Sequence, residues 1–392
     1  MSAITVDVIN DYTTFERLAP QWNETVERAG LTHPFLRHEW LRTWWDSFGQ
    51  DRLLNVMVVR AGRKIIALAP LMLETAKMYG ITVRRVQFLH NDHTPKADVI
   101  VTERADEAFD ALWASLMKAR SHWDVLQLSQ LPGDSPTHGQ IGRLAACGDY
   151  ATTLWQSDVS PYLELTSDWN AYLQGRNAKL RQNLRNRLNR LSQQGEVSLQ
   201  VIGDRAAVQH ARDHALSLES SGWKRQAGTA ICSDPNVLRF YTLLADRAAE
   251  QGWLRLVFLT VGGKRIATSY ASRYRDRLSF FKTGYDPEYA KYAPFKLLTY
   301  FAIKDGFSAG LREVDFLGDA EPWKLEWTTT TRPHDWLFVF GHTARAWLAY
   351  TAKCRVIPAA KRLLHAARPH TGHEDAAAAD RRPAALHIAG SH

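Results

Sequence analysis

The segment from Tyr292 to Lys296 could bind an anion. It reads Tyr-Ala-Pro-Phe-Lys, and Pro294 suits the first turn of a helix. The backbone N–H groups at a helix start attract negative charge, and Lys296 would add a cation. Because the segment lacks a Gly-rich phosphate cradle, its residues taken alone favour an ordinary helix start.

A basic helix is predicted around residues 176–190. Leucines spaced three and four residues apart form its buried stripe. Arg181 and Arg185 share one face and could hold a phosphate in a bidentate manner. A solvated basic face and a nucleic-acid surface are the alternatives, although no recognisable nucleic-acid-binding module accompanies the helix. Its cations are Arg176, Lys179, Arg181, Arg185, Arg187 and Arg190.

Several side chains of the second half could transfer or position a proton. Tyr285 could act as a general acid, and Asp286 could orient it or an amine, although Asp286 also suits the cap of a turn. Asp315 and Lys324 belong to a polar cluster that follows a predicted strand. A carboxylate there could deprotonate or position an amine, and the alternative is surface turn chemistry around Gly318.

The first half offers one histidine with nearby carboxylates. His93 lies in a polar loop with Asp92, and Asp98 follows. A histidine near a carboxylate can act as a base, but loop histidines are more often inert. In the second half, the pair Trp223-Lys224 could line an acceptor pocket, or Trp223 could belong to the core.

Composition limits the function classes. The chain has 392 residues, a formal charge of +8 and a pI near 9.3, which suits an anionic partner. Three widely separated cysteines, Cys147, Cys232 and Cys354, give neither a disulfide framework nor a zinc pattern, so no metal is expected. We expect a cytoplasmic protein, because no apolar run is long enough to cross a bilayer and the N-terminus lacks a secretory signal.

A repeated hairpin indicates two domains. LLNVMVVRAGRKIIAL at 53–68 aligns without a gap with LRLVFLTVGGKRIATS at 254–269, so that Gly62 matches Gly263. Each copy is a strand, a Gly turn with two basic residues and a second strand. We predict an α/β protein with an N-terminal domain at 1–165, a C-terminal domain at 166–345, a basic amphipathic segment at 346–370 and a disordered tail at 371–392.

Periodicity predicts the remaining elements. Helices are expected at 12–29, 38–48, 106–120 and 140–147, and then at 168–194, 206–220, 235–251 and 295–309. Strands outside the hairpins are expected at 83–89, 97–101, 125–128 and 161–165, and then at 196–202, 277–283 and 313–317.

Short motifs in a fixed order carry a family resemblance. They are Pro34-Phe35-Leu36 with Trp40, Trp44 and Trp45; RNAKLRQNLRNRLNRL before Gly195; Gly222-Trp223-Lys224 with Gly228-Thr229; and Thr283-Gly284-Tyr285-Asp286, Ala293-Pro294, Val314–Gly318 and Trp323-Lys324. The chain resembles the GNAT acyltransferases with a tandem fold, most closely the CelD-type acetyltransferases linked by name to cellulose biosynthesis, and also the Fem-type aminoacyltransferases. The resemblance ends near residue 345. Pro-Phe-Lys at 294–296 departs from the family's usual Pro-Gly.

The resemblance implies roles for these residues. The helix start would hold the pyrophosphate of acyl-CoA, with the thioester beside the 280–286 strand. The donor would contact Arg181, Arg185, Lys282, Thr283, Gly284, Tyr292, Ala293, Phe295 and Lys296. Tyr285, Asp315, Lys324 and His93 would serve catalysis, where Lys324 matches a lysine near the acyl-transfer site of Fem-like relatives. Trp223, Lys224, Asp98 and Asp286 would contact the acceptor.

The expected activity is direct transfer of an acyl group from acyl-CoA, or from an acyl carrier protein, to a primary amine. Expected acceptors are a lipid amine such as a sphingoid base and an amino sugar of a surface glycan. The basic segment after residue 345 suits an anionic membrane surface or a helix docked on the domain. The alternative functions are tRNA-dependent aminoacyl transfer and a non-catalytic role in polysaccharide synthesis.

Overall fold

The computed structural model describes residues 2–221, 228 and 230–359. The predictions for Trp223, for Lys224, for the basic segment beyond residue 359 and for the 371–392 tail lie outside the described residues. No helix in the described ranges is long and apolar enough to cross a membrane.

The elements of the first half are β1 (Ile4–Ile9), α1 (Tyr12–Arg17), α2 (Ala19–Arg28), η1 (Pro34–Leu36), α3 (His38–Phe48), β2 (Leu53–Leu54), β3 (Val56–Ala61), β4 (Lys64–Ala69), β5 (Leu71–Met78), β6 (Ile81–Phe88), β7 (Ile100–Val101), α4 (Ala105–Lys118), η2 (Arg120–His122), β8 (Val125–Pro132), α5 (Pro136–Cys147) and β9 (Ala151–Glu164).

The second half contains α6 (Trp169–Gln174), α7 (Ala178–Ser192), β10 (Val197–Ile202), α8 (Arg205–Glu219), η3 (Ile231–Ser233), α10 (Pro235–Glu250), β11 (Leu254–Val261), β12 (Lys264–Tyr274), β13 (Arg277–Tyr285), η4 (Pro287–Tyr292), α11 (Pro294–Ser308), β14 (Glu313–Asp315), α12 (Pro322–Leu325), β15 (Thr331–Phe340), α13 (Ala344–Thr351) and η5 (Ala352–Val356).

The predicted hairpin repeat is confirmed, with a shift of one residue. The first turn lies between Ala61 and Lys64 and the second between Val261 and Lys264, so Gly62 corresponds to Gly262 and not to Gly263. The register of the preceding strand is also repeated, because Ile4 faces Ala61 and Val197 faces Val261. Because Gly262 and Gly263 are adjacent, either one can be aligned with Gly62. The sequence alignment used Gly263 and was therefore shifted by one residue.

A second repeated unit follows each hairpin. In the first half β6 pairs in parallel with β8, and α4 lies between them in the chain. In the second half β13 pairs in parallel with β14, and α11 connects them. A parallel pair requires such a crossover connection. The two halves are therefore copies of one strand–helix–strand arrangement.

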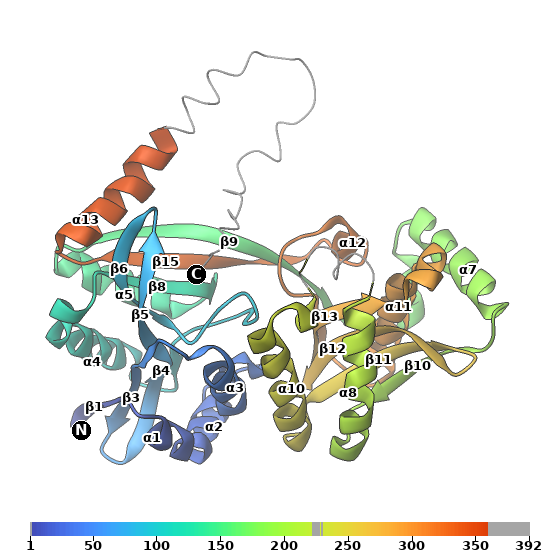
Figure 1. Cartoon of the computed structure of the whole chain (residues 1–392), viewed down its shortest axis with the longest axis horizontal. Coiled ribbons are helices and arrows are strands. Elements are labelled where there is room, and N and C mark those ends of the chain that lie inside the picture. Colours follow the sequence, from blue (N-terminus) through green and yellow to red (C-terminus); the bar gives the residue numbers. More distant parts are fainter. Residues whose placement is uncertain (1, 222–227, 229, 360–392) are drawn as a thin grey trace.

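The two halves exchange their last strands. β9 ends the first half but pairs with β14 of the second, and β15 ends the second half but pairs with β8 of the first. β9 and β15 also pair with each other. In the described part of the chain, the strands therefore form a four-stranded sheet and an eleven-stranded sheet that runs through both halves (Figure 1).

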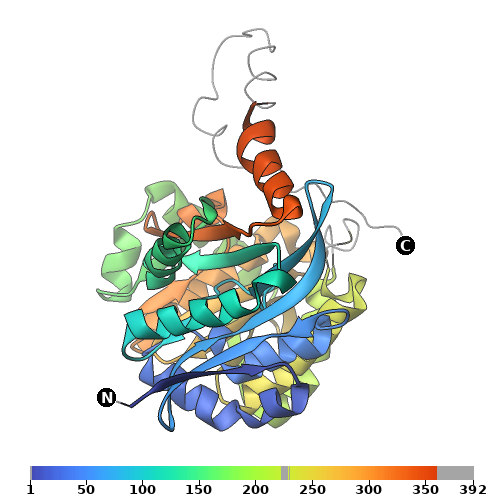
Figure 2. The same cartoon turned by 90° about the vertical axis from the view of Figure 1, so that its left-hand side faces the viewer.

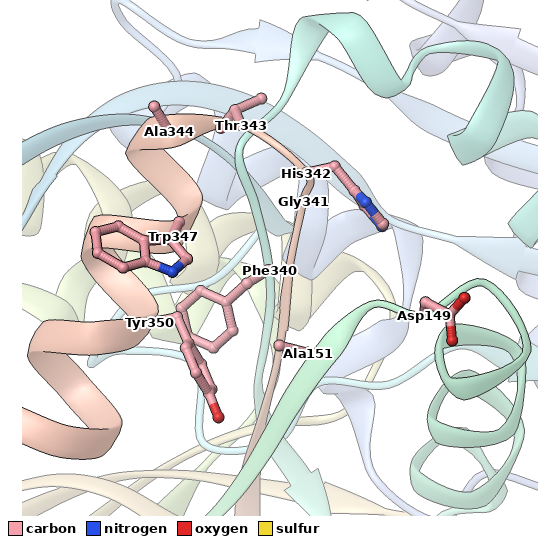
Figure 3. A pocket seen from close by; sticks show the side chains of 9 residues that line it. All are labelled: Asp149, Ala151, Phe340, Gly341, His342, Thr343, Ala344, Trp347 and Tyr350. Carbon is pink, nitrogen blue, oxygen red and sulfur yellow. The ribbon is translucent and has the colours of Figure 1, made fainter.

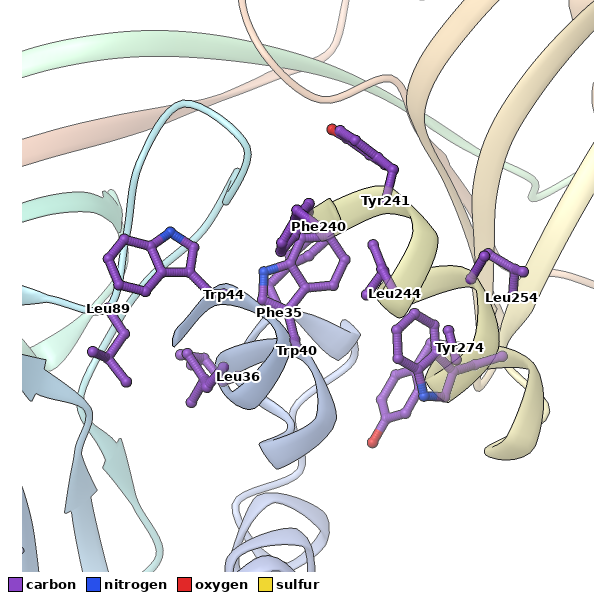
Figure 4. Packing of buried hydrophobic residues seen from close by; sticks show 14 of the residues in the cluster. Phe35, Leu36, Trp40, Trp44, Leu89, Phe240, Tyr241, Leu244, Leu254 and Tyr274 are labelled. Carbon is purple, nitrogen blue, oxygen red and sulfur yellow. The ribbon is translucent and has the colours of Figure 1, made fainter. Parts of the chain in front are cut away.

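One core joins the halves. In the first half it contains α1, α2 and α3, and in the second it contains α8 and α10. Trp40 of α3 lies 5.6 Å from Phe240 of α10 and 5.3 Å from Phe281 of β13, measured between ring centroids. Figure 4 shows the side chains of Trp40 and Phe240 packed between α3 and α10. The other sheet faces are covered by α4 and α5 in the first half and by α7 and α11 in the second.

Two long predicted helices are divided. The 12–29 segment breaks at Leu18, and Pro20 lies in the first turn of α2, where a proline is tolerated. The 168–194 segment breaks after Gly175, and the side chain of Asn177 caps α7 by accepting from Lys179 N at 2.8 Å. β15 and the first ten residues of β9 were not predicted as strands.

Candidate active site

A charged cavity lies between the two halves. Its volume is about 230 Å³. His93 and Lys324, which were predicted for catalysis, line it together with Lys282 and Thr283, which were predicted for the donor. They come from the loop after β6, from β13 and from α12, so the fold brings together residues that are far apart in the sequence. Three carboxylates, those of Asp92, Asp158 and Glu321, also line it. Of these, Asp158 was not considered from the sequence.

A second, more apolar cavity lies at the start of α11. It has a volume of about 220 Å³, and it is lined by Tyr285, Ala290, Ala293, Pro294, Phe295, Lys296, Trp323 and Trp327. Four of the residues predicted for the site, Tyr285, Ala293, Phe295 and Lys296, therefore share one cavity. Trp323 lines both cavities, so the two spaces meet at its side chain.

A β-bulge interrupts β13 beside the charged cavity. Tyr270 pairs with Lys282 and Ala271 pairs with Phe280, so Phe281 has no counterpart on β12. A bulge leaves ladder groups unpaired and turns the strand. The pairing of β5 with β6 in the first half runs without such a shift. The bulge is therefore a feature of the second copy.

The start of α11 is arranged to accept negative charge. Ala293 takes the left-handed conformation, with φ of 48°, and supplies no side-chain cap. The first amides of a helix have no intrahelical acceptor, so here they also lack a capping side chain. The first turn of α11 contains no acidic residue, and Lys296 pairs with Glu326 at 2.5 Å.

The equivalent start of α4 carries acidic residues, which would repel an anion. Arg104 takes the same left-handed conformation, with φ of 52°, but Asp106 and Glu107 occupy the first turn. The Arg104 guanidinium is bound by Glu107. The sequence analysis identified no helix start of this kind in the first half. The structure locates it and shows that its charges are unsuited to a phosphate.

His93 is held uncharged. Burial and the neighbouring Lys282 ammonium lower the pKa of His93 to about 4. Its ring stacks on Phe48 at 5.8 Å, and Tyr241 Oη lies 3.4 Å from Nδ1. A neutral imidazole at physiological pH can accept a proton, although its low pKa makes it a weak base.

Lys324 fixes the loop that borders the charged cavity. Its ammonium donates to the carbonyls of Leu317 at 2.7 Å and Asp319 at 2.9 Å, and it lies 3.1 Å from Glu321 Oε2. The side chain is almost fully buried. An ammonium group has three N–H donors, so these acceptors satisfy it and fix its charge at one place on the wall.

Asp315 lies in a buried ion network outside both cavities. Lys96 Nζ lies 2.5 Å from Asp315 Oδ2, and Leu317 N donates to Oδ1 at 2.9 Å. Although burial opposes ionisation, the charges of Lys96 and Arg332 lower the pKa of Asp315 to about 2. An ionised carboxylate with satisfied oxygens suits a structural role better than proton transfer.

Asp158 is the principal residue of the charged cavity that the sequence analysis missed. Gln130 Nε2 donates to Asp158 Oδ2 at 2.7 Å, and Ser157 Oγ donates to Gln130 Oε1 at 3.3 Å. Gln130 has φ of 58°, a strained conformation that occurs often at functional sites. The β-branched and aromatic residues in Thr-Thr-Leu-Trp at 152–155 were the available signal, because such residues favour a strand.

The other predicted residues lie elsewhere. Gly284 packs against α8, where a Cβ atom would collide with the backbone of Glu219. Asp286 caps η4 and pairs with Lys264 at 2.9 Å. Burial raises the pKa of Asp98 to about 6, and Thr137 Oγ1 donates to Asp98 Oδ1 at 2.6 Å, away from the cavity. Tyr292 is buried in η4.

The basic helix α7 lies beside the α11 start without lining either cavity. α7 contacts both η4 and α11, and Arg190 stacks over the Tyr292 ring at 5.8 Å. Arg181 and Arg185 form no ion pair within the described ranges, and the buried Nε of Arg181 has no acceptor there. No cluster of three or more potential metal ligands occurs in those ranges.

Comparison with known proteins agrees with this geometry. Residues 178–325 match the family described as the acetyltransferase (GNAT) domain. The chain has the fold of the GNAT acyltransferases, in two copies. The match indicates an acyltransferase, and no curated protein matches the sequence.

Two solved structures share the fold over most of their length. The C-terminal domain (DUF2156) of a candidate lysylphosphatidylglycerol synthetase from Agrobacterium fabrum has 13% identity and a TM-score of 0.53, over 86% of this chain and 96% of that one. FemX has 10% identity and a TM-score of 0.51, over 76% of this chain and 91% of that one. At such identities the similarity concerns the fold alone.

Proposed function

We propose that the protein transfers an acyl group from a thioester donor, either acyl-CoA or an acyl carrier protein, to a primary amine. The observation that supports this most strongly is the pair of cavities that meet at Trp323. The apolar cavity at the α11 start would receive the pantetheine arm and its phosphate. The charged cavity between the halves would receive the amine.

The proposed reaction needs no covalent enzyme intermediate. The neutral amine nitrogen attacks the thioester carbonyl, so that a C–N bond forms and the C–S bond breaks. The nitrogen loses a proton and the thiolate gains one. Backbone N–H groups freed by the bulge at Phe281, with the fixed charge of Lys324, would stabilise the oxyanion. Tyr285, which lines the donor cavity, would protonate the thiolate.

The acceptor side combines carboxylates with an uncharged histidine. Asp158, fixed by Gln130, would hold the incoming amine together with Glu321. His93, uncharged at neutral pH because its pKa is about 4, would accept the proton that the amine loses. In this scheme Asp315 is a positioning residue that fixes Lys96 and the Leu317 amide.

The charged cavity has three carboxylates and two lysines, which favours an acceptor that enters as an ammonium ion. A lipid amine such as a sphingoid base and an amino sugar of a surface glycan both satisfy this condition. The ammonium ion would release one proton to solvent before the neutral nitrogen attacks. The name of the Agrobacterium fabrum protein denotes a lipid product, which supports the lipid amine. A CelD-type relationship would support the glycan.

Transfer from an aminoacyl-tRNA is the second candidate function, and α7 favours it. Five cations of this helix form no ion pair with any residue in the described ranges, and they are Lys179, Arg181, Arg185, Arg187 and Arg190. Such a surface could bind a polyanion.

Ligand-induced stabilisation separates the two functions. Thermal unfolding is measured with CoA, with a long-chain acyl-CoA and with tRNA, because a ligand that binds the native state raises Tm. We expect acyl-CoA to raise Tm and a panel of primary amines to release free thiol from it, with an amide product identified by mass spectrometry. Binding to tRNA without any response to CoA species would refute the proposal.

A matched pair of variants tests the acceptor assignment. Asp158→Asn should raise KM for the amine by roughly tenfold or more, because a charge-assisted contact is lost. The Tm shift caused by acyl-CoA should be unchanged. Asp149→Asn, at an exposed site outside the charged cavity, is the control and should leave KM unaltered.

A further inference from the structure

Helix α13 is packed with its small residues inward. Its buried residues are Ala346 and Ala349, whereas Trp347 is 62% exposed and Leu348 is 46% exposed. A surface helix ordinarily turns its large apolar side chains toward the core. Here the alanines allow α13 to lie close to β6 and β15, and the large side chains face outward.

The fold fixes this orientation. Thr343 caps α13 by accepting from Ala346 N at 3.1 Å, and its hydroxyl donates to Asp124 at 2.9 Å. Lys353, in the π-turn η5, lies 4.1 Å from the ring centroid of Phe338 and 4.6 Å from that of Trp155. Figures 1 and 2 both show α13 projecting from the body of the molecule.

Other apolar groups gather beside α13. Tyr79, at the β5–β6 turn, is 45% exposed and accepts from Lys353 Nζ at 3.2 Å, and Val356 is 57% exposed. With Trp347 and Leu348, these are four of the nine large exposed hydrophobic side chains in the described ranges. We refer to the four residues together as the α13 patch.

An open pocket of about 370 Å³ lies next to the patch. Figure 3 shows Trp347 and Tyr350 with Phe340 on its aromatic side, and Asp149 on the opposite side. The pocket gives an apolar chain a place to lie against Trp347.

A long stretch of the sequence around α13 contains basic residues and no acidic ones. The sequence from Trp336 to His373 contains no Asp or Glu, and its cations are Arg345, Lys353, Arg355, Lys361, Arg362 and Arg368. A surface that combines an exposed Trp and Leu with cations matches the interface of an anionic lipid bilayer.

We propose that the α13 patch docks on an anionic lipid surface, with Trp347 and Leu348 entering the interface and Arg345 and Arg355 contacting the headgroups. A second copy of this chain is a poorer partner, because two such patches would bring like charges together. The proposal is independent of the acyltransferase function.

Sedimentation with lipid vesicles tests the proposal on the full chain. We expect binding to phosphatidylcholine vesicles that contain about 30% phosphatidylglycerol, little binding to phosphatidylcholine alone, and weaker binding at high salt. The double variant Trp347→Ser/Leu348→Ser should reduce the partition coefficient roughly tenfold or more. Leu53→Ser, at a residue that is 66% exposed elsewhere, is the matched control and should bind normally.

Charge reversal supplies a second readout. Arg345→Glu/Arg355→Glu should abolish the preference for anionic vesicles, and circular dichroism checks that each variant is folded. Equal binding to both vesicle types, or a double Ser variant that binds normally, would overturn the proposal. A concentration-dependent dimer that the double Ser variant disrupts would assign the patch to a second copy instead. No assay here requires turnover, so the result does not depend on the proposed reaction.

Discussion

At the scale of single residues, the charged cavity contains both groups that act by their charge and groups held neutral. Lys324 keeps a cation at the wall because two carbonyls and a carboxylate satisfy it. His93 stays uncharged because burial and Lys282 lower its pKa. Asp315 accepts from the amide of Leu317, a residue of the cavity wall. The proposed chemistry therefore depends on how neighbours set each charge.

Replacing Lys324 tests its role directly. We expect Lys324→Met to lower kcat by roughly 100-fold or more, because a preorganised charge at the oxyanion is lost. The variant should also lose about 2–4 kcal/mol of unfolding free energy, since buried acceptors lose their donor. Thiol-release assays measure kcat, and chemical denaturation measures the free energy of unfolding. Lys304→Met, at an exposed site on α11, should change neither, and full activity of Lys324→Met would remove Lys324 from the mechanism.

Gly284 supports the fold through packing. Its missing Cβ allows β13 to approach the backbone of α8 at Glu219, so Gly284→Ala should destabilise the protein by about 3 kcal/mol or more, or prevent folding. Gly139→Ala, in α5 with open space around it, should be neutral or slightly stabilising. Urea unfolding of the two variants provides the comparison, and similar midpoints would contradict the packing argument.

At the scale of elements, residues close together in the chain could be grouped from the sequence, whereas residues brought together by strand pairing could not. β13, η4 and α11 are contiguous in the chain, so the sequence could assign Tyr285, Phe295 and Lys296 to one candidate site, and in the structure they line one cavity. Asp158 and Gln130 reach the other cavity through strands whose partners are distant in the sequence. Periodicity describes one element at a time, so it carries no information about such pairings.

The two helix starts lead to a prediction about the donor. Lys296→Glu would give α11 an acidic first turn like that of α4. We expect the dissociation constant for CoA to rise roughly tenfold or more, because the helix start would repel phosphate. The loss of the Lys296–Glu326 ion pair should lower stability, and the favourable interaction of an acid with the helix dipole should offset part of that loss.

Calorimetric titration with CoA, together with Tm, separates these effects. The matched control is Glu107→Lys in the first turn of α4, which should leave CoA affinity unchanged. If Glu107→Lys weakened CoA binding and Lys296→Glu did not, the donor site would belong to the first copy.

At the scale of the whole molecule, shared strand pairing and a shared core join the two halves. β9 has both of its partners, β14 and β15, in the second half of the chain, and one aromatic core contains helices from both halves. The domain boundary predicted near residue 165 lies just after β9. The strand pairing crosses it in both directions.

Truncated chains test whether each half needs the exchanged strand of the other in order to fold. We expect residues 1–359 to give a soluble protein with a cooperative unfolding transition. Residues 1–330 should not, because removal of β15 leaves β8 and β9 with open edges. Separate expression of 1–165 and 166–392 should fail, and co-expression should restore the fold. A folded 1–330 chain would show that the exchanged strand is dispensable.

Acid stability should reflect the buried histidines. Burial lowers the pKa of His90 to about 3, and burial with nearby cations lowers those of His93 and His334 to about 4. The unfolded chain binds these protons near pH 6.5, so the free energy of unfolding should fall between pH 6.5 and pH 4, by about 1.4 kcal/mol per pKa unit and group.

The contribution of Asp315, whose pKa is lowered, remains until the pH falls below its unfolded value of 3.8. Urea unfolding at a series of pH values measures the loss of stability in both pH ranges, that of the histidines and that of Asp315. His90→Gln should reduce the slope between pH 6.5 and pH 4, and a stability that is constant between pH 7 and pH 5 would contradict this prediction.

The strand exchange also determines when the chain can fold during synthesis. β9 is synthesised before either of its partner strands. β15, which pairs with β8, is synthesised about two hundred residues after β8. At about 5–20 residues per second, that interval lasts on the order of 10–40 s. For this time the nascent first half presents unpaired strand edges to the cell. We therefore expect the first half to complete its sheet only after β15 has been made, and we expect its open strand edges to need protection from aggregation until then.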